Sequence, residues 1–174
     1  MFKNVLITGS PGVGKTTVIK TVIPLLNVKA GGFFTEEIRV KGNREGFAVE
    51  TLDGQKGVLS HINFKSPYNV GKYGVDVQSF EQIAIPAIES AIKDKELIVI
   101  DEIGKMELFS EGFKEAVIKA LDSKKPVLGV IKRGSDGFIN AIKARNDVKI
   151  FTITYENRNT IPAEIAHLFE TLPF

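Results

Sequence analysis

The sequence predicts an α/β fold of three layers, in which helices cover both faces of a mostly parallel central sheet. Short, almost wholly apolar runs alternate along the chain with longer segments in which apolar residues recur every three to four positions. These are the patterns of buried strands and of amphipathic helices. A glycine-rich turn that contains lysine lies between the first strand and the first helix. Strands that alternate with helices favour a parallel sheet covered on both sides.

The first strand and helix lie within residues 2–17, FKNVLITGSPGVGKTT. Phe2 and the run Val5, Leu6 and Ile7 predict a short buried strand. Thr16 opens the helix, whose apolar side consists of Val18, Ile19, Val22, Ile23 and Leu26. Between the two, Gly9 to Thr16 match the pattern Gly-x-x-x-x-Gly-Lys-Ser/Thr, which is the phosphate-binding P-loop.

The residue types of this loop suit the binding of a nucleoside phosphate. Glycines let the backbone curl so that successive N–H groups converge on phosphate oxygens. Lys15 supplies a charge for the β- and γ-phosphates, and Thr16 offers a hydroxyl to Mg²⁺. The dipole of the following helix favours an anion at the same place. The expected nucleotide-binding residues of the loop are Gly9, Ser10, Pro11, Gly12, Val13, Gly14, Lys15, Thr16 and Thr17.

An antiparallel β-meander is expected at about residues 31–62, inserted into the α/β core or laid on its edge. Its three short strands are Phe33 to Val40, Gly46 to Leu52 and Lys56 to Ile62. The second turn contains Asp53-Gly54, which is a strong signal for a tight hairpin. The segment from Phe64 to Val75 contains Pro67, Gly71 and Gly74 and predicts a loop.

The remainder of the chain returns to alternating helices and strands. A capping box, Ser79-x-x-Gln82, predicts the start of a helix that Pro86 interrupts. Ser110 and Thr160 are expected to cap two later helices. The other expected elements are strands at Leu97 to Ile100, Val127 to Ile131 and Val148 to Ile153 and a short helix at Asp136 to Ala144. Without a linker or internal repeat, residues 1–174 predict a single domain.

A second group of candidate site residues follows the apolar strand Leu97 to Ile100. Asp101 and Glu102 come directly after it, which is the Walker B pattern. Ligands of open α/β sheets bind outside the carboxyl ends of the strands, so Asp101 is expected to reach the Mg²⁺ that Thr16 also coordinates. Glu102 is placed to orient or deprotonate a water for attack on the γ-phosphate.

Asp101-Glu102-Ile103-Gly104 also fits the Asp-x-x-Gly pattern of switch GTPases. However, the guanine-reading motif Asn-Lys-x-Asp is absent from the sequence. The residue after Asp101 is an acid suited to hydrolysis. We therefore expect the nucleotide base to be read loosely, with Ile103 and Gly104 among the nucleotide-binding residues.

Phosphoryl transfer benefits from a second cation besides Lys15. Lys105 is close to Glu102 in the sequence and is the preferred candidate. Arg133 and Arg158 follow strands that are expected to end at the same edge of the sheet. Glu156-Asn157-Arg158 is also a loop that can flank the nucleotide base, and Arg158 is included among the nucleotide-binding residues.

Composition limits the classes of partner and compartment. The 23 Lys and Arg residues nearly balance the 21 Asp and Glu residues, which speaks against a general nucleic-acid or membrane surface. Cysteine is absent, so disulfides and thiolate metal sites are excluded. No apolar run approaches the roughly 20 residues of a membrane span, and no signal peptide precedes the first strand. We expect a cytoplasmic monomer.

Several stretches resemble those of the small P-loop nucleoside-triphosphatases (NTPases) first known from thermophiles, a family with a cancer-related member in animals. The stretches are Gly9 to Thr17, Gly31-Gly32-x-x-Thr35-Glu36-Glu37-x-Arg39, Tyr73-Gly74-Val75-x-Val77, Asp101-Glu102-Ile103-Gly104-Lys105-Met106-Glu107 and Glu156-Asn157-Arg158. The resemblance implies a RecA-like P-loop NTPase fold. It further implies slow, Mg²⁺-dependent hydrolysis of ATP, GTP and other nucleoside triphosphates with little base preference, with Lys15, Asp101 and Glu102 in the roles given above.

Two other functions stay open at this point. The first is phosphoryl transfer to a small molecule, as in nucleoside or nucleotide kinases, with the meander and the loop Tyr68 to Gly74 forming an acceptor pocket. The side chains expected to line such a pocket are Thr35, Glu36, Glu37 and Arg39. The second is a nucleotide-dependent binding module for RNA or a protein, which the balanced charge does not favour in the case of RNA.

Overall fold

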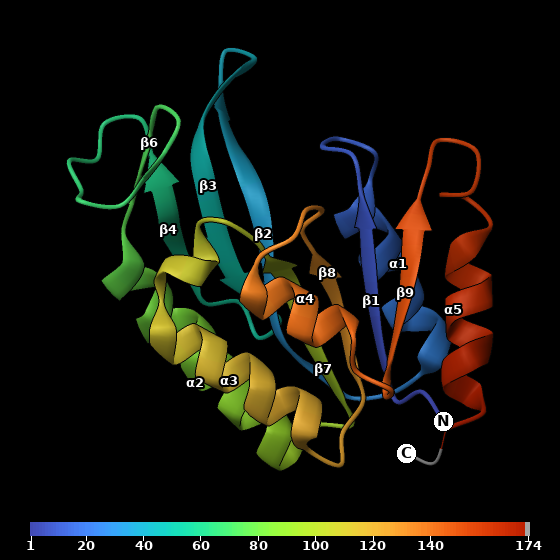
Figure 1. The fold of residues 1–174 in the computed structure, drawn as a ribbon. Coiled ribbons are helices and arrows are strands. Elements are labelled where there is room, and N and C mark those ends of the chain that lie inside the picture. The colour runs from blue at the N-terminus through green and yellow to red at the C-terminus, as the bar shows by residue number, and fades with distance from the viewer. Residues whose placement is uncertain (173–174) are drawn as a thin grey trace.

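The computed structural model describes residues 1–172, and its strands form one mixed sheet between two layers of helices (Figure 1). The order across the sheet is β5-β6-β4-β3-β2-β7-β8-β1-β9. The strands are β1 (Asn4–Gly9), β2 (Ala30–Val40), β3 (Asn43–Thr51), β4 (Lys56–His61), β5 (Asn69–Val70), β6 (Tyr73–Val75), β7 (Leu97–Ile103), β8 (Val127–Ile131) and β9 (Val148–Ile153). The three-layer α/β class predicted from the sequence is confirmed.

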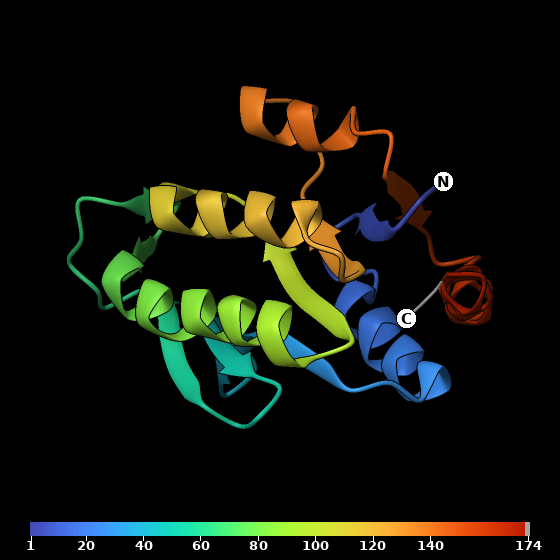
Figure 2. The same cartoon turned by 90° about the horizontal axis from the view of Figure 1, so that it is seen from below.

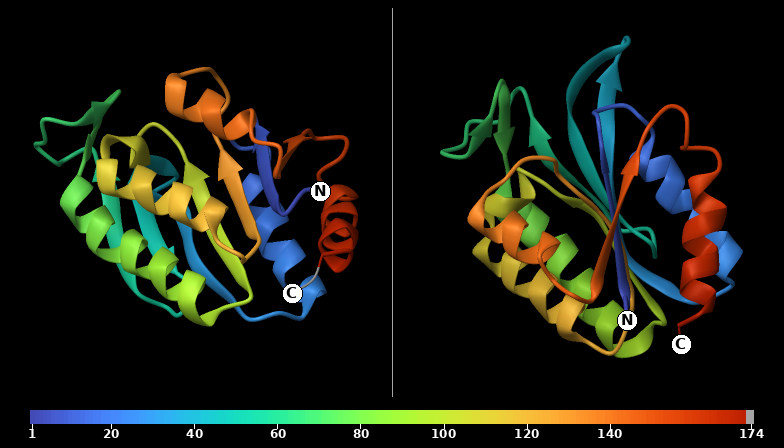
Figure 3. Two further views of the ribbon diagram at one scale, coloured as in Figure 1. Left: turned by 60° about the horizontal axis from the view of Figure 1, so that its bottom comes forward. Right: turned by 45° about the vertical axis from the view of Figure 1, so that its right-hand side comes forward.

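The helices divide between the two faces of the sheet. They are α1 (Lys15–Leu26), α2 (Val77–Asp94), the 3₁₀ turn η1 (Glu107–Phe109), α3 (Glu111–Asp122), α4 (Gly137–Lys143) and α5 (Ile161–Glu170). Seen from below, α2 and α3 lie together on one face, with α4 beyond them, and α1 and α5 lie on the other (Figure 2). Both views of Figure 3 show the same division. Among residues 1–172, no helix is both long and apolar enough to cross a membrane.

The strand β2 joins the parallel and antiparallel halves of the sheet. Its first part pairs with β7 in parallel, from Ala30↔Leu97 to Phe34↔Asp101, and most of its length pairs antiparallel with β3. Gly32 lies at the crowded start of this strand, where a Cβ would come within 1.9 Å of the Val99 carbonyl oxygen. The antiparallel pairing of β2 with β3 and of β3 with β4 confirms the meander predicted at residues 31–62. The meander continues the central sheet at one edge. The β2–β3 hairpin extends beyond the other strands (Figure 1).

Aromatic packing fixes α2 and α3 on the sheet behind β7. Phe33, Phe80 and Phe113 come from β2, α2 and α3 and are fully buried. Their ring centroids lie 5.1 to 5.9 Å apart in edge-to-face arrangements. Such aromatic contacts add to the burial of apolar area. The turn between β7 and α3, which includes η1, is thus held between fixed elements.

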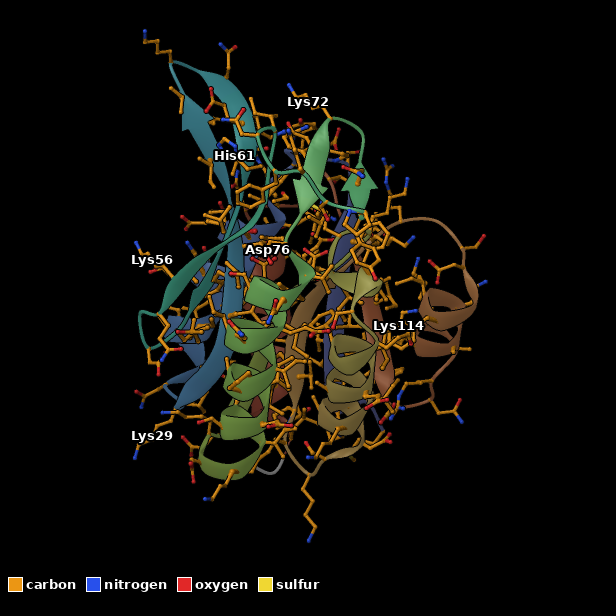
Figure 4. All side chains as sticks on the ribbon, turned by 90° about the vertical axis from the view of Figure 1, so that its left-hand side faces the viewer. Lys29, Lys56, His61, Lys72, Asp76 and Lys114 are labelled. Atoms are coloured by element: carbon orange, nitrogen blue, oxygen red, sulfur yellow. The ribbon has the colours of Figure 1, made fainter. Side chains whose placement is uncertain are left out.

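Four local predictions are wrong. Pro86 does not interrupt its helix, since α2 runs without a break from Val77 to Asp94. The capping box at Ser79 is not formed, because α2 begins earlier and the Ser79 backbone N–H donates to Asp76 Oδ1 at 3.0 Å. Figure 4 shows Asp76 at the start of α2. The loop predicted from Phe64 to Val75 contains the short strands β5 and β6. Thr160 stands at the N-cap of α5 but does not cap it with its side chain, because its hydroxyl donates to the Asn157 carbonyl.

A polar network ties the start of β1 to the loops at the amino edge of the sheet. Lys3 Nζ donates to the carbonyls of Leu121 at 2.6 Å and Ser123 at 2.7 Å. Arg145 forms a two-pronged pair with Asp147, with Nε–Oδ1 at 2.8 Å and Nη2–Oδ2 at 2.9 Å. This network lies at the end of the strands away from the candidate site, so it offers a way to change stability without changing the site.

Candidate nucleotide site

The P-loop lies between the carboxyl end of β1 and the start of α1. Gly12 and Gly14 both have positive φ, at 75° and 104°. A side chain is strained at such angles, which explains why glycine occupies both positions. Val13 points into the core beneath α1 and is 2 % exposed. The loop is therefore anchored by one apolar side chain while its backbone remains at the surface.

The first turn of α1 has no side-chain cap, because Gly14 is its N-cap residue. Backbone N–H groups at a helix start that lack a partner form a natural site for an anion. Lys15 folds back over the loop, and its Nζ donates to the carbonyls of Gly9 at 3.0 Å and Ser10 at 3.1 Å. The ammonium group thus lies at the mouth of the loop, where the phosphates of a nucleotide are expected.

The P-loop and the Walker B strand meet through one hydrogen bond. Thr16 Oγ1 donates to Asp101 Oδ2 at 2.8 Å. Asp101 is 1 % exposed, and its second oxygen, Oδ1, has no hydrogen-bond partner. Burial raises the pKa of Asp101 to about 7, against the lowering effect of the Thr16 hydrogen bond. A buried carboxylate with a free oxygen is an arrangement that a cation stabilises.

These oxygen atoms fit a magnesium ion that also binds a nucleotide. Mg²⁺ is held in such sites by one or two protein oxygens together with phosphate oxygens and water. Asp101 Oδ1 and Thr16 Oγ1 supply oxygens of this kind. Within residues 1–172, no cluster of three or more His, Cys, Asp or Glu side chains has the geometry of a metal site.

Two further carboxyl groups lie beside Asp101. Burial raises the pKa of Glu102, while the charge of Lys15 acts in the opposite direction. Glu107 lies in η1 and is 4 % exposed. Burial, and next the charge of Glu102, raise the pKa of Glu107 well above its usual value. The sequence reasoning did not identify Glu107 as a site residue. The signal was an acid within the otherwise apolar run Met106-Glu107-Leu108-Phe109.

The three candidate second cations differ in their positions. Lys105 and Arg133 are both exposed, and in the part of the chain that the structure describes neither makes an ion pair or a side-chain hydrogen bond. Arg158 contacts the P-loop, with Nη1 3.4 Å from the Val13 carbonyl oxygen. Its guanidinium also lies 5.1 Å from the ring centroid of Tyr155. Of the three, Arg158 alone has a direct contact with the phosphate-binding loop among the described residues.

The loop after β9 is shaped by Asn157. Its side chain accepts from the Thr154 backbone N–H at 2.8 Å and donates to the Thr152 carbonyl at 2.8 Å. The amide is thus engaged with its own loop, and Arg158 is the member of Glu156-Asn157-Arg158 that faces the P-loop. A groove of about 330 Å³ lies between α1 and the start of α5. Its lining residues are Gly14, Thr17, Val18, Thr21, Arg158, Asn159 and Pro162.

The polar side chains suggested for an acceptor pocket are mostly paired with other residues. Glu36 accepts from Lys20 at 2.7 Å on the α1 side of the sheet. Glu37 pairs with Arg39 at 2.7 Å and with Arg44 at 3.1 Å. The first of these ion pairs joins α1 to β2, and the pair with Arg44 joins β2 to β3. They do not favour an acceptor pocket, since its expected charged groups already have partners.

Comparison with known proteins agrees with this geometry. The family described as NTPase matches residues 4–166. The chain is 52% identical over 161 residues to nucleoside-triphosphatase THEP1 of Thermotoga sp. (strain RQ2), covering 92% of each chain. It is 42% identical over 181 residues to the human cancer-related nucleoside-triphosphatase, covering 95% of each.

Two solved structures have the same fold. The crystal structure of THEP1 from the hyperthermophile Aquifex aeolicus superposes with a TM-score of 0.87 at 41% identity, covering 96% of this chain and 99% of that one. The solution structure of the human cancer-related nucleoside triphosphatase gives 0.85 at 39% identity, covering 99% and 100%. The chain belongs to the THEP1 and cancer-related nucleoside-triphosphatase family.

Proposed function

We propose that this protein hydrolyses nucleoside 5′-triphosphates, including ATP and GTP, to the diphosphate and phosphate in a Mg²⁺-dependent reaction. The observation that carries the proposal is the hydrogen bond from Thr16 Oγ1 to Asp101 Oδ2 at 2.8 Å. It brings the phosphate-binding loop and the acidic end of β7 into one site. The names of the relatives, which describe nucleoside-triphosphatases, support the same activity.

The triphosphate binds with its β- and γ-phosphates in the P-loop. The backbone N–H groups at the start of α1 and the ammonium of Lys15 donate to the phosphate oxygens. Lys15 then exchanges its bonds to the neutral Gly9 and Ser10 carbonyls for stronger bonds to charged phosphate oxygens. The loop is preorganised for this exchange, because its glycines already have the required backbone conformation.

Thr16 and Asp101 would hold the magnesium ion. When bound, such an ion would offset negative charge on the β- and γ-phosphates and thereby lower the barrier to transfer. Thr16 would turn its hydroxyl hydrogen away from Asp101 and offer a lone pair. Asp101 would contribute the oxygen that has no partner in the protein, Oδ1.

Glu102 orients the attacking water and accepts its proton. The water oxygen forms a bond to the γ-phosphorus as the bond to the β,γ-bridging oxygen breaks, and the diphosphate leaves. A carboxylate that acts as general base contributes typically about 10²- to 10⁴-fold. Lys105 supplies a second positive charge to the transferring phosphoryl group, and Arg158 supports the phosphates from the other side of the P-loop.

Base selectivity is proposed to be low. The groove of about 330 Å³ beside Gly14, Thr17 and Arg158 receives the nucleoside part. Its walls offer the hydroxyl groups of Thr17 and Thr21, hydrocarbon, the guanidinium of Arg158 and one amide, that of Asn159. Such groups contact any base by packing and stacking, whereas discrimination needs hydrogen-bonding groups matched to one base edge.

The test measures phosphate release from ATP, GTP, CTP and UTP with Mg²⁺ and with EDTA. We expect similar kcat/KM for the four nucleotides and no release in EDTA. Glu102→Gln is expected to bind nucleotide while losing turnover by about 10²-fold or more. Glu111→Gln, at an exposed acid on α3, is the matched control and retains activity. Turnover like that of the wild type in Glu102→Gln would contradict the assigned base.

A second experiment separates hydrolysis from transfer to an acceptor. The protein is incubated with γ-labelled ATP and a pool of small metabolites. We expect the label only in free phosphate. Label in a metabolite would make the protein a kinase-like transferase, and hydrolysis would then be a side reaction.

A further inference from the structure

Glu107 is a buried carboxylic acid that the proposed reaction does not use. It begins η1, the turn that connects the active end of β7 to α3. Its neighbours Met106, Leu108 and Phe109 pack against the apolar core. An acid in such surroundings costs more free energy than a glutamine or leucine of similar volume. Its presence at this position therefore calls for a role other than stability.

Gly104 lies beside the side chains of both Glu107 and Glu102, the proposed general base. A Cβ atom on Gly104 would lie 2.8 Å from Glu102 Cγ, 2.9 Å from Glu102 Oε1 and 3.0 Å from Glu107 Oε2. The two carboxyl groups thus approach the same side of one glycine, and no side chain fits between them. Gly104 does not have a positive φ. Glycine is needed here for space and not for backbone conformation.

The turn that carries these groups is closed by backbone hydrogen bonds. Leu108 N donates to the Gly104 carbonyl at 3.0 Å, and Ser110 N donates to the Glu107 carbonyl at 3.1 Å. Ser110 also caps α3 through Phe113 N at 2.9 Å. The Glu107 backbone is therefore fixed relative to both β7 and α3, and its buried side chain lies beside Glu102.

We propose that Glu107 and Gly104 are positioning residues that hold the Glu102 carboxylate in the orientation in which it meets the attacking water. The inference rests on the proposed role of Glu102 as general base. Glu107 occupies the volume into which the Glu102 side chain would otherwise turn, and Gly104 leaves the space in which its carboxylate lies. Displacing a reacting group by about 1 Å costs on the order of 10²-fold in rate.

The experiment measures kcat, KM, the nucleotide Kd and the melting temperature of Glu107→Ala, Glu107→Gln and Gly104→Ala with Mg-ATP. Glu107→Ala removes the side chain that lies beside Glu102. We expect kcat to fall at least about tenfold, with Kd within about twofold of wild type. Glu107→Gln keeps the shape and is expected to restore kcat to within about threefold. Gly104→Ala inserts a methyl group against Glu102 and is expected to lower kcat in the same way as Glu107→Ala.

Two controls match these changes. Glu111→Ala removes an exposed acid of the same region, and Gly137→Ala adds a methyl group where nothing lies within 4 Å. Both should retain kcat. If Glu107→Ala does not fold, Gly104→Ala and Glu107→Gln decide the question. A kcat like that of the wild type in Gly104→Ala, a parallel loss of Kd and kcat, or no recovery with glutamine would each overturn the inference.

The outcome for Glu102→Gln separates this inference from the proposed function. If that variant keeps its turnover, the function of Glu102 itself is wrong. If it loses turnover while Glu107→Ala and Gly104→Ala keep theirs, the proposed function stands and the positioning role fails.

Discussion

Thr16 Oγ1 and Asp101 Oδ2 lie 2.8 Å apart, although 85 positions separate these residues in the sequence. The contact exists because β1 and β7 are separated in the sheet by β8 alone, so the helix after β1 starts beside the carboxyl end of β7. The hydroxyl of the first helical turn thus meets a buried carboxylate. The function proposed for the protein depends on this pair.

Removal of the Thr16 hydroxyl is expected to weaken the binding of the magnesium ion that the reaction needs. In Thr16→Ala the ion loses a protein oxygen, so the Mg²⁺ concentration for half-maximal phosphate release should rise at least about tenfold. Thr16→Ser keeps the hydroxyl and should stay close to wild type. The measurement is phosphate release at fixed ATP over a Mg²⁺ titration. Equal titration curves for Thr16→Ala and wild type would show that Thr16 does not hold the ion.

Lys15→Ala is expected to lose nucleotide affinity as well as rate. The Nζ atom lies at the mouth of the P-loop, bonded to two of its carbonyls, and charge-assisted bonds to phosphate contribute about 1.5–3 kcal/mol. Calorimetric titration with a non-hydrolysable triphosphate should therefore show a Kd at least about tenfold higher. Lys29→Ala is the matched control. The Lys29 carbonyl accepts from Leu97 N at the amino end of β7, which is the end opposite to Asp101, and Figure 4 shows Lys29 at the lower end of the molecule. Unchanged affinity in Lys15→Ala would contradict the phosphate role.

Arg158→Ala is expected to weaken the binding of all nucleotides to a similar extent. The guanidinium lies against the P-loop at Val13 and lines the groove proposed for the nucleoside, where we expect it to contact phosphate or to stack on any base. We expect a loss of about tenfold in affinity for both ATP and GTP, with their ratio changed less than about threefold. Arg158→Lys should recover part of the loss. A loss confined to one nucleotide would indicate that Arg158 reads the base.

The pair of Arg145 and Asp147 is expected to stabilise the fold at neutral pH and to lose this effect in acid. The hydrogen bonds from Arg145 hold the pKa of Asp147 below its ordinary value of 3.8. The ionised form therefore stabilises the folded state above about pH 4, and this contribution disappears as the pH falls through the lowered pKa. Because the pair is partly exposed, Asp147→Asn should cost only about 1 kcal/mol at pH 7.

The check for this pair is urea unfolding of wild type and Asp147→Asn at pH 7 and at pH 3. The difference between their free energies of unfolding should shrink at the lower pH. Activity at pH 7 should be unchanged, since the pair lies at the amino edge of the sheet. A difference that is equal at both pH values would show that the carboxylate charge is not what stabilises the fold.

The elements that carry the chemistry could be predicted because their signals are local. The P-loop spacing and the apolar strand before Asp101 each identify a strand end without knowledge of the fold. The start of α2 could not be predicted in the same way, since Asp76 and Ser79 are both good caps and only the pairing of β6 with β4 decides between them. The two- and three-residue strands β5 and β6 lie among Pro67, Gly71 and Gly74, which are loop signals.

Glu107 shows which part of the candidate site could not be predicted from the sequence. Its spacing from Glu102 has no helical or strand period, because the bulge at the end of β7 and the 3₁₀ turn both interrupt regular structure. Its nearness to Glu102 depends on the packing of Met106, Leu108 and Phe109 against the core. The burial of Glu107 beside Glu102 is therefore information that only the fold supplies.

A crystal structure with Mg²⁺ and a non-hydrolysable triphosphate tests the central claim most directly. We predict that the γ-phosphate lies in the P-loop beside Lys15, that the ion lies about 2.0–2.1 Å from Thr16 Oγ1, and that Asp101 contacts the ion directly or through a bound water. A further water should lie between the Glu102 carboxylate and the γ-phosphorus, about 3 Å from each. A structure in which Glu102 points away from the γ-phosphate, and the ion contacts neither Thr16 nor Asp101, would contradict the account.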